Sequence, residues 1–228
     1  MRRAYETIIA GGGGFAGVLA RPVLSALSGL YRLGLGVRNA SIQARGGDGT
    51  VVGAPVISIG NLTTGGTGKT PMVIHVVERL RALGGNPVVV SRGYGAGDGP
   101  ADELLLVERA VPGVVGIAEP NRVAGARRAI AEHAADVIVL DDGFQHRRIH
   151  RDLDLVLVDA TEPLAEARLI PRGRLREPLS ALSRADAVVL TRCDQVSESA
   201  RTAQVEWLAA RAPGLAILTC AHATRGLT

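Results

Sequence analysis

The chain has few aromatic side chains and few cysteines. Phe, Trp and Tyr make up 3% of its 228 residues, which is too little stacking surface for a protein that binds single-stranded nucleic acid, so we expect no nucleic-acid partner. The two cysteines, Cys193 and Cys220, form no CxxC pair and have no histidines spaced around them. This pattern argues against a zinc site and a disulfide framework, and it fits a reducing compartment.

Most of the chain has no net charge. Residues 1–50 carry six arginines against Glu6 and Asp48, a balance of +4, whereas residues 51–228 carry 20 basic and 20 acidic side chains, a balance of zero. The net charge of +4 therefore belongs to the N-terminal segment. We divide the chain into a basic, apolar segment (1–50), which we expect to associate with an anionic membrane surface, and a second domain (51–228).

No apolar run in the N-terminal segment reaches the ~18 residues of a membrane-spanning helix, because Arg21 interrupts residues 8–37. We expect a helix over residues 22–38, with proline at its start, that lies in a membrane interface. Its apolar face would hold Leu24, Leu27, Leu30, Tyr31 and Leu35. A helix packed on the domain and a signal peptide, suggested by Arg2-Arg3 before an apolar run, remain alternatives.

Seven short runs rich in Val, Ile and Leu follow, and helical patterns separate several of them. The runs are nearly continuous rather than alternating, which is typical of strands buried on both faces, hence of a parallel sheet covered by helices. The predicted strands are 56–60, 87–91, 113–118, 136–142, 153–159, 185–191 and 215–220, and the predicted helices are 70–83, 121–134 and 200–211.

Lysine is nearly absent: the chain has 25 arginines and one lysine, Lys69. It lies in the stretch TTGGTGKTP (63–71), between the predicted strand VISIG and a predicted helix. This is the context of a P-loop, in which glycine-rich backbone and a helix N-terminus turn N–H groups toward phosphate. We expect the nucleotide to be held by Thr63, Thr64, Gly65, Gly66, Thr67, Gly68, Lys69 and Thr70.

The side chains of this loop have distinct expected roles. Lys69 would reach the β- and γ-phosphates as a compact charge that the planar fork of arginine cannot replace, and Thr70 would bind Mg²⁺. Thr63 stands where the usual motif has its first glycine, and Thr64 where partitioning ATPases have a signature lysine. The predicted fold is α/β: a P-loop NTPase-type, mostly parallel sheet flanked by helices, with an N-terminal apolar or amphipathic helix.

An acidic pair, Asp141-Asp142, ends the apolar run DVIVL. Carboxylates at the carboxyl edge of a parallel sheet can hold Mg²⁺ or its water shell, as a Walker B element does. Two adjacent carboxylates repel each other unless a cation or donors are near, which favours a metal site over a pair that caps the following turn. The basic runs 145–152 and 171–178 would bind an anionic acceptor or form solvated loops.

Four segments together resemble the tetraacyldisaccharide 4'-kinase family over roughly residues 20–220. They are GNLTTGGTGKTP (60–71), VSRGYG (90–95), DDGFQHRRIHRDLD (141–154) and LIPRGRLREPL (169–179). The resemblance implies phosphorylation, dependent on ATP and Mg²⁺, of the 4'-hydroxyl of a lipid A disaccharide 1-phosphate. It also implies a peripheral protein on the cytoplasmic face of a Gram-negative inner membrane, with an N-terminal helix that contacts lipid.

The resemblance also implies roles for individual residues. Lys69 and Asp102 would be catalytic, with Asp102 as the base that accepts the proton of the sugar hydroxyl and Glu103 beside it. Thr70, Asp141 and Asp142 would hold the metal. The substrate would contact Arg122, His146, Arg147 and Arg176, and Arg122 would touch phosphate or face solvent.

The chain departs from the family pattern at two places. Between Tyr94 and Asp102 the loop is shorter than usual, and Leu104 replaces a proline. The family's later F-x-D-H-type motif does not occur, and His222 is a poor substitute. We therefore expect a shortened member that keeps nucleotide binding better than kinase activity. A regulatory ATPase or GTPase of the partitioning or metallochaperone type is the alternative, since TRCD (191–194) weakly resembles a guanine-reading motif.

Overall fold

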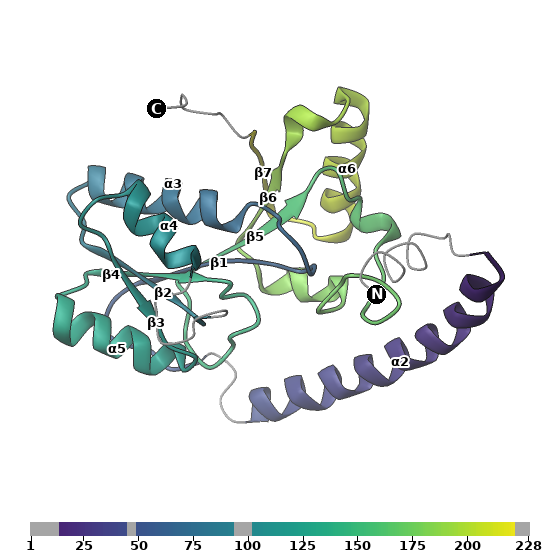
Figure 1. Ribbon diagram of the computed structural model, residues 1–228, viewed down its shortest axis with the longest axis horizontal. Coiled ribbons are helices and arrows are strands. Elements are labelled where there is room, and N and C mark those ends of the chain that lie inside the picture. The colour runs from purple at the N-terminus through teal and green to yellow at the C-terminus, as the bar shows by residue number, and fades with distance from the viewer. Residues whose placement is uncertain (1–13, 45–48, 94–101, 222–228) are drawn as a thin grey trace.

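The computed structural model describes residues 14–44, 49–93 and 102–221 (Figure 1). Its α-helices are α2 (Gly14–Ala44), α3 (Lys69–Ala82), α4 (Asp102–Ala110), α5 (Arg122–His133) and α6 (Glu198–Arg211). Its strands are β1 (Val56–Asn61), β2 (Pro87–Ser91), β3 (Val115–Ala118), β4 (Val137–Asp141), β5 (Leu153–Asp159), β6 (Ala187–Thr191) and β7 (Ala216–Thr219). Short 3-10 helices span Leu164–Glu166, Leu179–Arg184 and Cys193–Gln195. Each predicted strand and each of the three predicted helices is confirmed.

The strands form one sheet in the order β3-β2-β4-β1-β5-β6-β7, and every neighbouring pair is parallel. The predicted parallel α/β fold is therefore confirmed. The register places Ile59 of β1 beside Asp141 of β4, and Asn61 beside Leu157 of β5. Because all strands run the same way, the loops that leave their carboxyl ends share one rim of the sheet.

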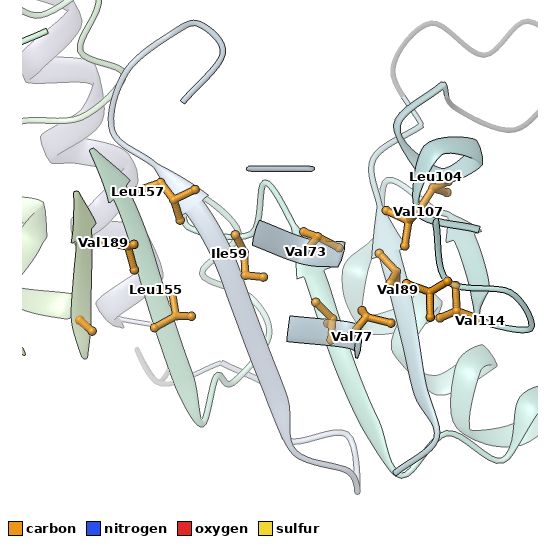
Figure 2. Close-up of a cluster of buried hydrophobic side chains, with 13 residues drawn as sticks. Ile59, Val73, Val77, Val89, Leu104, Val107, Val114, Leu155, Leu157 and Val189 are labelled. Atoms are coloured by element: carbon orange, nitrogen blue, oxygen red, sulfur yellow. The ribbon is translucent and has the colours of Figure 1, made fainter. Parts of the chain in front are cut away.

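Helices cover both faces of the sheet, as the continuous apolar strands require. Val89 packs with Val73 and Val77 of α3 and with residues of α4 on one face (Figure 2). Its neighbours Val88 and Val90 face the opposite side, where they pack against α5. The β5 and β6 half of that second face packs against α6. Buried side chains, nearly all of them aliphatic, thus form three clusters, one on the first face and two on the second, as the shortage of aromatic residues predicted.

Asp102, the base that the resemblance implies, opens helix α4, which was not among the helices predicted from the sequence. Leu104 and Val107 of this helix are buried against the sheet, and Asp102 and Glu103 form its acidic first turn. Nine residues with two buried positions give too weak a period to separate a helix from a loop. The Leu104 that replaces the family's proline is a core residue here.

The predicted bounds of the N-terminal helix were wrong. Helix α2 begins at Gly14 and ends at Ala44, so Pro22 lies inside it rather than at its start. The predicted apolar face is also divided: Leu35 is buried and Leu24 and Tyr31 are half-buried, whereas Leu27 and Leu30 are exposed. Among the described helices, none is long and apolar enough to cross a membrane.

The exchange Gly60→Ala is expected to destabilise the fold by roughly 1–3 kcal/mol or more, because the added methyl has no free space. A Cβ at this position would lie 2.5 Å from the Cβ and 2.7 Å from the backbone nitrogen of Phe144. Gly34→Ala is the matched control, since a Cβ there meets nothing within 4 Å. Urea unfolding of both variants would measure the difference, and an unaffected Gly60→Ala protein would contradict this packing.

Candidate nucleotide-binding site

The glycine-rich loop between β1 and α3 has the backbone of a phosphate-binding turn. Gly65 and Gly68 adopt positive φ angles of 132° and 84°, which glycine tolerates best. Helix α3 begins at Lys69 without a side-chain cap at Gly68, so the N–H groups of its first turn are free to face a ligand. Thr64, Gly65 and Gly66 are exposed, while Thr63 and Thr67 are buried and anchor the loop.

The segment 169–176 holds one side of the loop through its main chain. Thr63 forms an antiparallel bridge with Leu175, the Thr64 amide donates to the Arg174 carbonyl at 2.7 Å, and the Arg176 amide donates to the Leu62 carbonyl at 2.7 Å. The second basic run of the sequence is therefore not a freely solvated loop. It lies along the candidate phosphate-binding loop and brings the side chain of Arg176 to the same rim.

Lys69 and Asp142 meet at the centre of this rim. The Lys69 Nζ lies 3.5 Å from the Asp142 Oδ1 and 3.4 Å from the Asn61 Oδ1. The Arg176 Nη1 donates to the Asp142 Oδ2 at 2.7 Å. Burial by itself would raise the pKa of Asp142, but Lys69 and Arg176 outweigh burial and lower it, so this carboxylate is charged at neutral pH. The two distant motifs predicted to cooperate thus lie together.

Asp141 has a different environment from its neighbour. Its side chain is 2% exposed, and its Oδ1 has no hydrogen-bond partner in the described part of the chain. Burial, followed by the negative charge of Glu103, raises the pKa of Asp141 to about 7, although Lys69 opposes the shift. A buried carboxyl oxygen without a partner is costly, and a cation would relieve that cost.

The predicted substrate residue Arg122 does not face solvent. It is 2% exposed, and its guanidinium donates to the Glu119 carbonyl at 2.8 Å and to the Asp141 carbonyl at 3.3 Å. Arg122 therefore supports the turn that carries the acidic pair. Arg147 instead reaches helix α2, where its Nη2 donates to the Gln43 Oε1 at 3.4 Å.

A cavity of about 880 Å³ opens beside the acidic pair, between α2, the N-terminus of α5 and the loop after β4. Among the described residues, four arginines and no acidic side chain line it: Arg38, Arg122, Arg147 and Arg148. His146 lines it too, but not as the positive charge that the sequence suggested. Burial and the charges of Arg122 and Arg92 lower the pKa of His146 to about 4, so its imidazole is neutral at pH 7.

The proposed base Asp102 is exposed, and its side chain forms no hydrogen bond or ion pair with another described residue. Its neighbour Glu103 lies close enough to raise the pKa of Asp141, so the start of α4 belongs to the same rim. Residues 94–101 and His222 lie outside the described residues.

Sequence reasoning missed two residues of the site. Asn61, the last residue of β1, accepts from Lys69 through its side chain, and its carbonyl accepts from the Gln145 Nε2 at 2.9 Å. Gln145 also accepts from Arg176 at 3.3 Å. A buried asparagine directly after an apolar strand was the available signal for Asn61, whereas the position of Gln145 depends on a turn after β4.

We expect His146 to stay neutral down to about pH 4. Because the unfolded chain takes up this proton near pH 6.5, the group costs stability as the pH falls from 6.5 to 4. NMR titration of the imidazole, assigned with His146→Asn, would measure the pKa. The exchange Arg92→Gln removes one repelling charge and should raise it, so an unchanged or lower pKa in that variant would contradict the assigned cause.

A parallel sheet whose central strand leads into a phosphate-binding loop, with an acidic pair on the adjacent strand, defines a P-loop nucleotide-binding protein. The model of the tetraacyldisaccharide-1-P 4'-kinase family matches residues 20–225, and the chain belongs to this family.

Individual relatives agree. The chain is 44% identical to a tetraacyldisaccharide 4'-kinase from an Anaeromyxobacter species over 90% of its own length and 60% of the relative. It is 42% identical to the tetraacyldisaccharide 4'-kinase of Geobacter sulfurreducens, over 79% of this chain and 56% of the relative. The crystal structure of LpxK from Aquifex aeolicus in complex with ATP superposes with a TM-score of 0.68 at 34% identity, over 75% of this chain and 58% of that one. The chain thus spans little more than half the length of these relatives.

Proposed function

We propose that the chain binds ATP with Mg²⁺ and takes part in phosphorylating the 4'-hydroxyl of a lipid A disaccharide 1-phosphate. The observation that carries this proposal is the contact of Lys69 with Asp142, the neighbour of Asp141, at the mouth of the glycine-rich loop in a member of this kinase family. ATP supplies the phosphoryl group, and Mg²⁺ neutralises the charge of its phosphates. No separate three-ligand metal cluster occurs among the described residues, which fits an ion that few carboxylates hold together with phosphate oxygens.

The described residues fit these ligands. The Asp141 Oδ1 is buried without a partner, and the uncapped start of α3 offers N–H groups beside Lys69. In the proposed arrangement the amides of residues 63–70 and Lys69 bind the triphosphate, and Thr70, Asp141 and Asp142 hold the metal. Asp102 accepts the proton of the acceptor hydroxyl, from a position at the start of α4 near the same rim.

The cavity lined by arginines is the proposed place for the acceptor's anionic group. Its lining combines guanidinium groups, which bind phosphate in a bidentate manner, with the capped N-terminus of α5 at Asn121. Three of the predicted substrate residues, Arg122, Arg147 and the neutral His146, line this cavity, whereas the fourth, Arg176, binds Asp142.

Helix α2 supports a proposed place on an anionic membrane surface, the cytoplasmic face of the inner membrane in this family. The half of the helix turned away from the domain carries a continuous apolar stripe, whose exposed residues are Val18, Leu19, Val23, Leu27, Leu30, Leu33 and Val37. The opposite half contacts the domain, where Tyr31 donates to the Arg176 carbonyl at 2.7 Å and Arg38 donates to the Gln145 carbonyl at 2.7 Å. A helix with one face on protein and an exposed apolar face suits an interface.

The function is tested by two measurements on the same chain. Isothermal titration with ATP and with GTP, each with and without Mg²⁺, should show Mg²⁺-dependent binding that prefers ATP. Transfer of labelled phosphate from ATP to a tetraacylated disaccharide 1-phosphate should then be measured for this chain and for a full-length relative. Absence of ATP binding would refute the proposal, and preferential GTP binding would favour a regulatory NTPase.

Membrane association gives a separate prediction. Leu30→Asp in the exposed stripe should weaken binding to phosphatidylglycerol vesicles by about tenfold or more, because a leucine that is 65% exposed no longer enters the lipid. Leu83→Asp is the matched control, since Leu83 is 85% exposed at the end of α3, away from the stripe. Vesicle sedimentation measures both, and equal losses would show that α2 is not the contact.

A further inference from the structure

The end of β6 holds the second side of the glycine-rich loop. The Thr191 hydroxyl lies 3.1 Å from the Thr67 carbonyl and 3.3 Å from the Val158 carbonyl of β5, either of which can accept its proton. The Arg192 Nη2 donates to the Gly66 carbonyl at 2.7 Å. The carbonyls of Gly66 and Thr67 are consecutive in the loop, and two consecutive residues contact them. The contacts join segments more than 120 residues apart in the chain, so they depend on the strand order that brings β6 close to the loop.

The direction of these two carbonyls determines the direction of the two N–H groups in the same peptide units, which are candidate donors to phosphate. A peptide unit is planar and trans, so its N–H points opposite to its C=O. When the carbonyls of Gly66 and Thr67 turn toward β6, the N–H groups of Thr67 and Gly68 turn away from it. Successive N–H groups turned to one side form an anion-binding concavity.

Contacts of its side chain and of the adjacent backbone hold Arg192 in place. Its guanidinium forms an ion pair with Asp159 at the end of β5, and Asp159 is buried and accepts from the Thr161 amide at 2.9 Å and hydroxyl at 2.6 Å. The backbone of Arg192 has a φ of 56°, in the left-handed region. The next amide, of Cys193, donates to the Cys220 carbonyl beyond β7 at 3.1 Å. The guanidinium thus joins a rigid carboxylate to a loop carbonyl.

We propose that Thr191 and Arg192 are positioning residues, which hold the amides of Thr67 and Gly68 in the phosphate-binding arrangement before the nucleotide arrives. The inference rests on the proposed ATP binding, and it gives the TRCD segment a role other than reading guanine. Arginine suits this role because its planar fork can bind Asp159 and the Gly66 carbonyl at the same time, which the point charge of lysine cannot.

The first test compares Thr191→Val, which keeps the shape but removes the hydroxyl, with Thr191→Ser, which keeps the hydroxyl. Arg192→Ala and Arg192→Lys form the second pair. We expect Thr191→Val and Arg192→Ala each to weaken the binding of ATP and of inorganic tripolyphosphate about tenfold, the loss of one hydrogen bond. Thr191→Ser should bind within about twofold of the wild type, and Arg192→Lys should fall between Arg192→Ala and the wild type.

NMR relaxation of the nucleotide-free chain separates positioning from general stability. In Thr191→Val and Arg192→Ala the backbone order parameters of Thr67 and Gly68 should fall, while those of β1 and β4 keep their wild-type values. If the wild type binds ATP and these variants bind it equally well with unchanged order parameters, the inference is wrong and the proposed function stands. If the wild type fails to bind ATP, the proposed function is wrong, and the order parameters alone decide whether the two residues order the loop.

Discussion

Replacing Lys69 by arginine is expected to weaken ATP binding by roughly 100-fold, about as much as replacing it by methionine. The Lys69 Nζ occupies a narrow position, 3.4 Å from the Asn61 Oδ1 and 3.5 Å from the Asp142 Oδ1, and its side chain is 13% exposed. A guanidinium is too broad to replace an ammonium between these groups and a phosphate. Fluorescence titration with a labelled ATP analogue would measure the three affinities.

Arg79→Lys is the control for this pair, because Arg79 is exposed on the same helix. That exchange should leave ATP affinity and the unfolding midpoint unchanged. If Lys69→Arg bound ATP like the wild type, the argument that the site needs an ammonium would be wrong, although the loop could still bind phosphate. If Lys69→Met also bound normally, the nucleotide site would lie elsewhere.

Asp141→Asn should have two effects of opposite sign. Without Mg²⁺ at pH 8 we expect the free energy of unfolding to rise by roughly 1–3 kcal/mol, because the exchange removes a buried charge whose Oδ1 has no partner. The pKa of Asp141 is raised to about 7, so the charge costs stability above the unfolded pKa of 3.8, and the full cost is present above pH 7. The gain should therefore disappear near pH 4.

The same exchange should weaken Mg²⁺-dependent ATP binding by roughly 10- to 100-fold, since a proposed metal ligand is lost. Glu206→Gln on α6, where the side chain is exposed, removes an acidic group without either effect. Urea unfolding in EDTA measures the change in stability, and calorimetry with MgATP measures the change in affinity. A variant that is less stable yet binds MgATP normally would show that Asp141 has a structural role only.

Patterns that depend on neighbours in sequence were predicted correctly. The uninterrupted Val, Ile and Leu runs predicted all seven strands. For β1, β2, β4, β5 and β6 the reason is burial on both faces, which leaves no alternation to misread, whereas β7 is mostly exposed. The loop around Lys69 and the acid pair after β4 could be placed on one rim, because parallel strands present their carboxyl ends together. The chemistry of the motifs and the geometry of the sheet both predict that Lys69 and the acidic pair lie close together.

Features that depend on tertiary contacts were missed or misjudged. The two faces of α2 are both apolar, so its sequence could not show that Leu24 and Leu35 turn toward the domain while Leu30 turns away. The charge of His146 depends on burial and on Arg122, which precedes it by 24 residues and lies close only in the fold. The contact of Arg192 with the glycine-rich loop likewise requires β6 to lie near β1.

The environment of Lys69 has a practical consequence for chemical probing. Apart from the α-amino group, the chain contains one primary amine, and its side chain is only partly exposed beside Asp142. Amine-directed acylation followed by mass spectrometry would therefore read a single position without background from other lysines. If added nucleoside triphosphate protects that amine, the extent of acylation at Lys69 would measure the fraction of the site that is occupied.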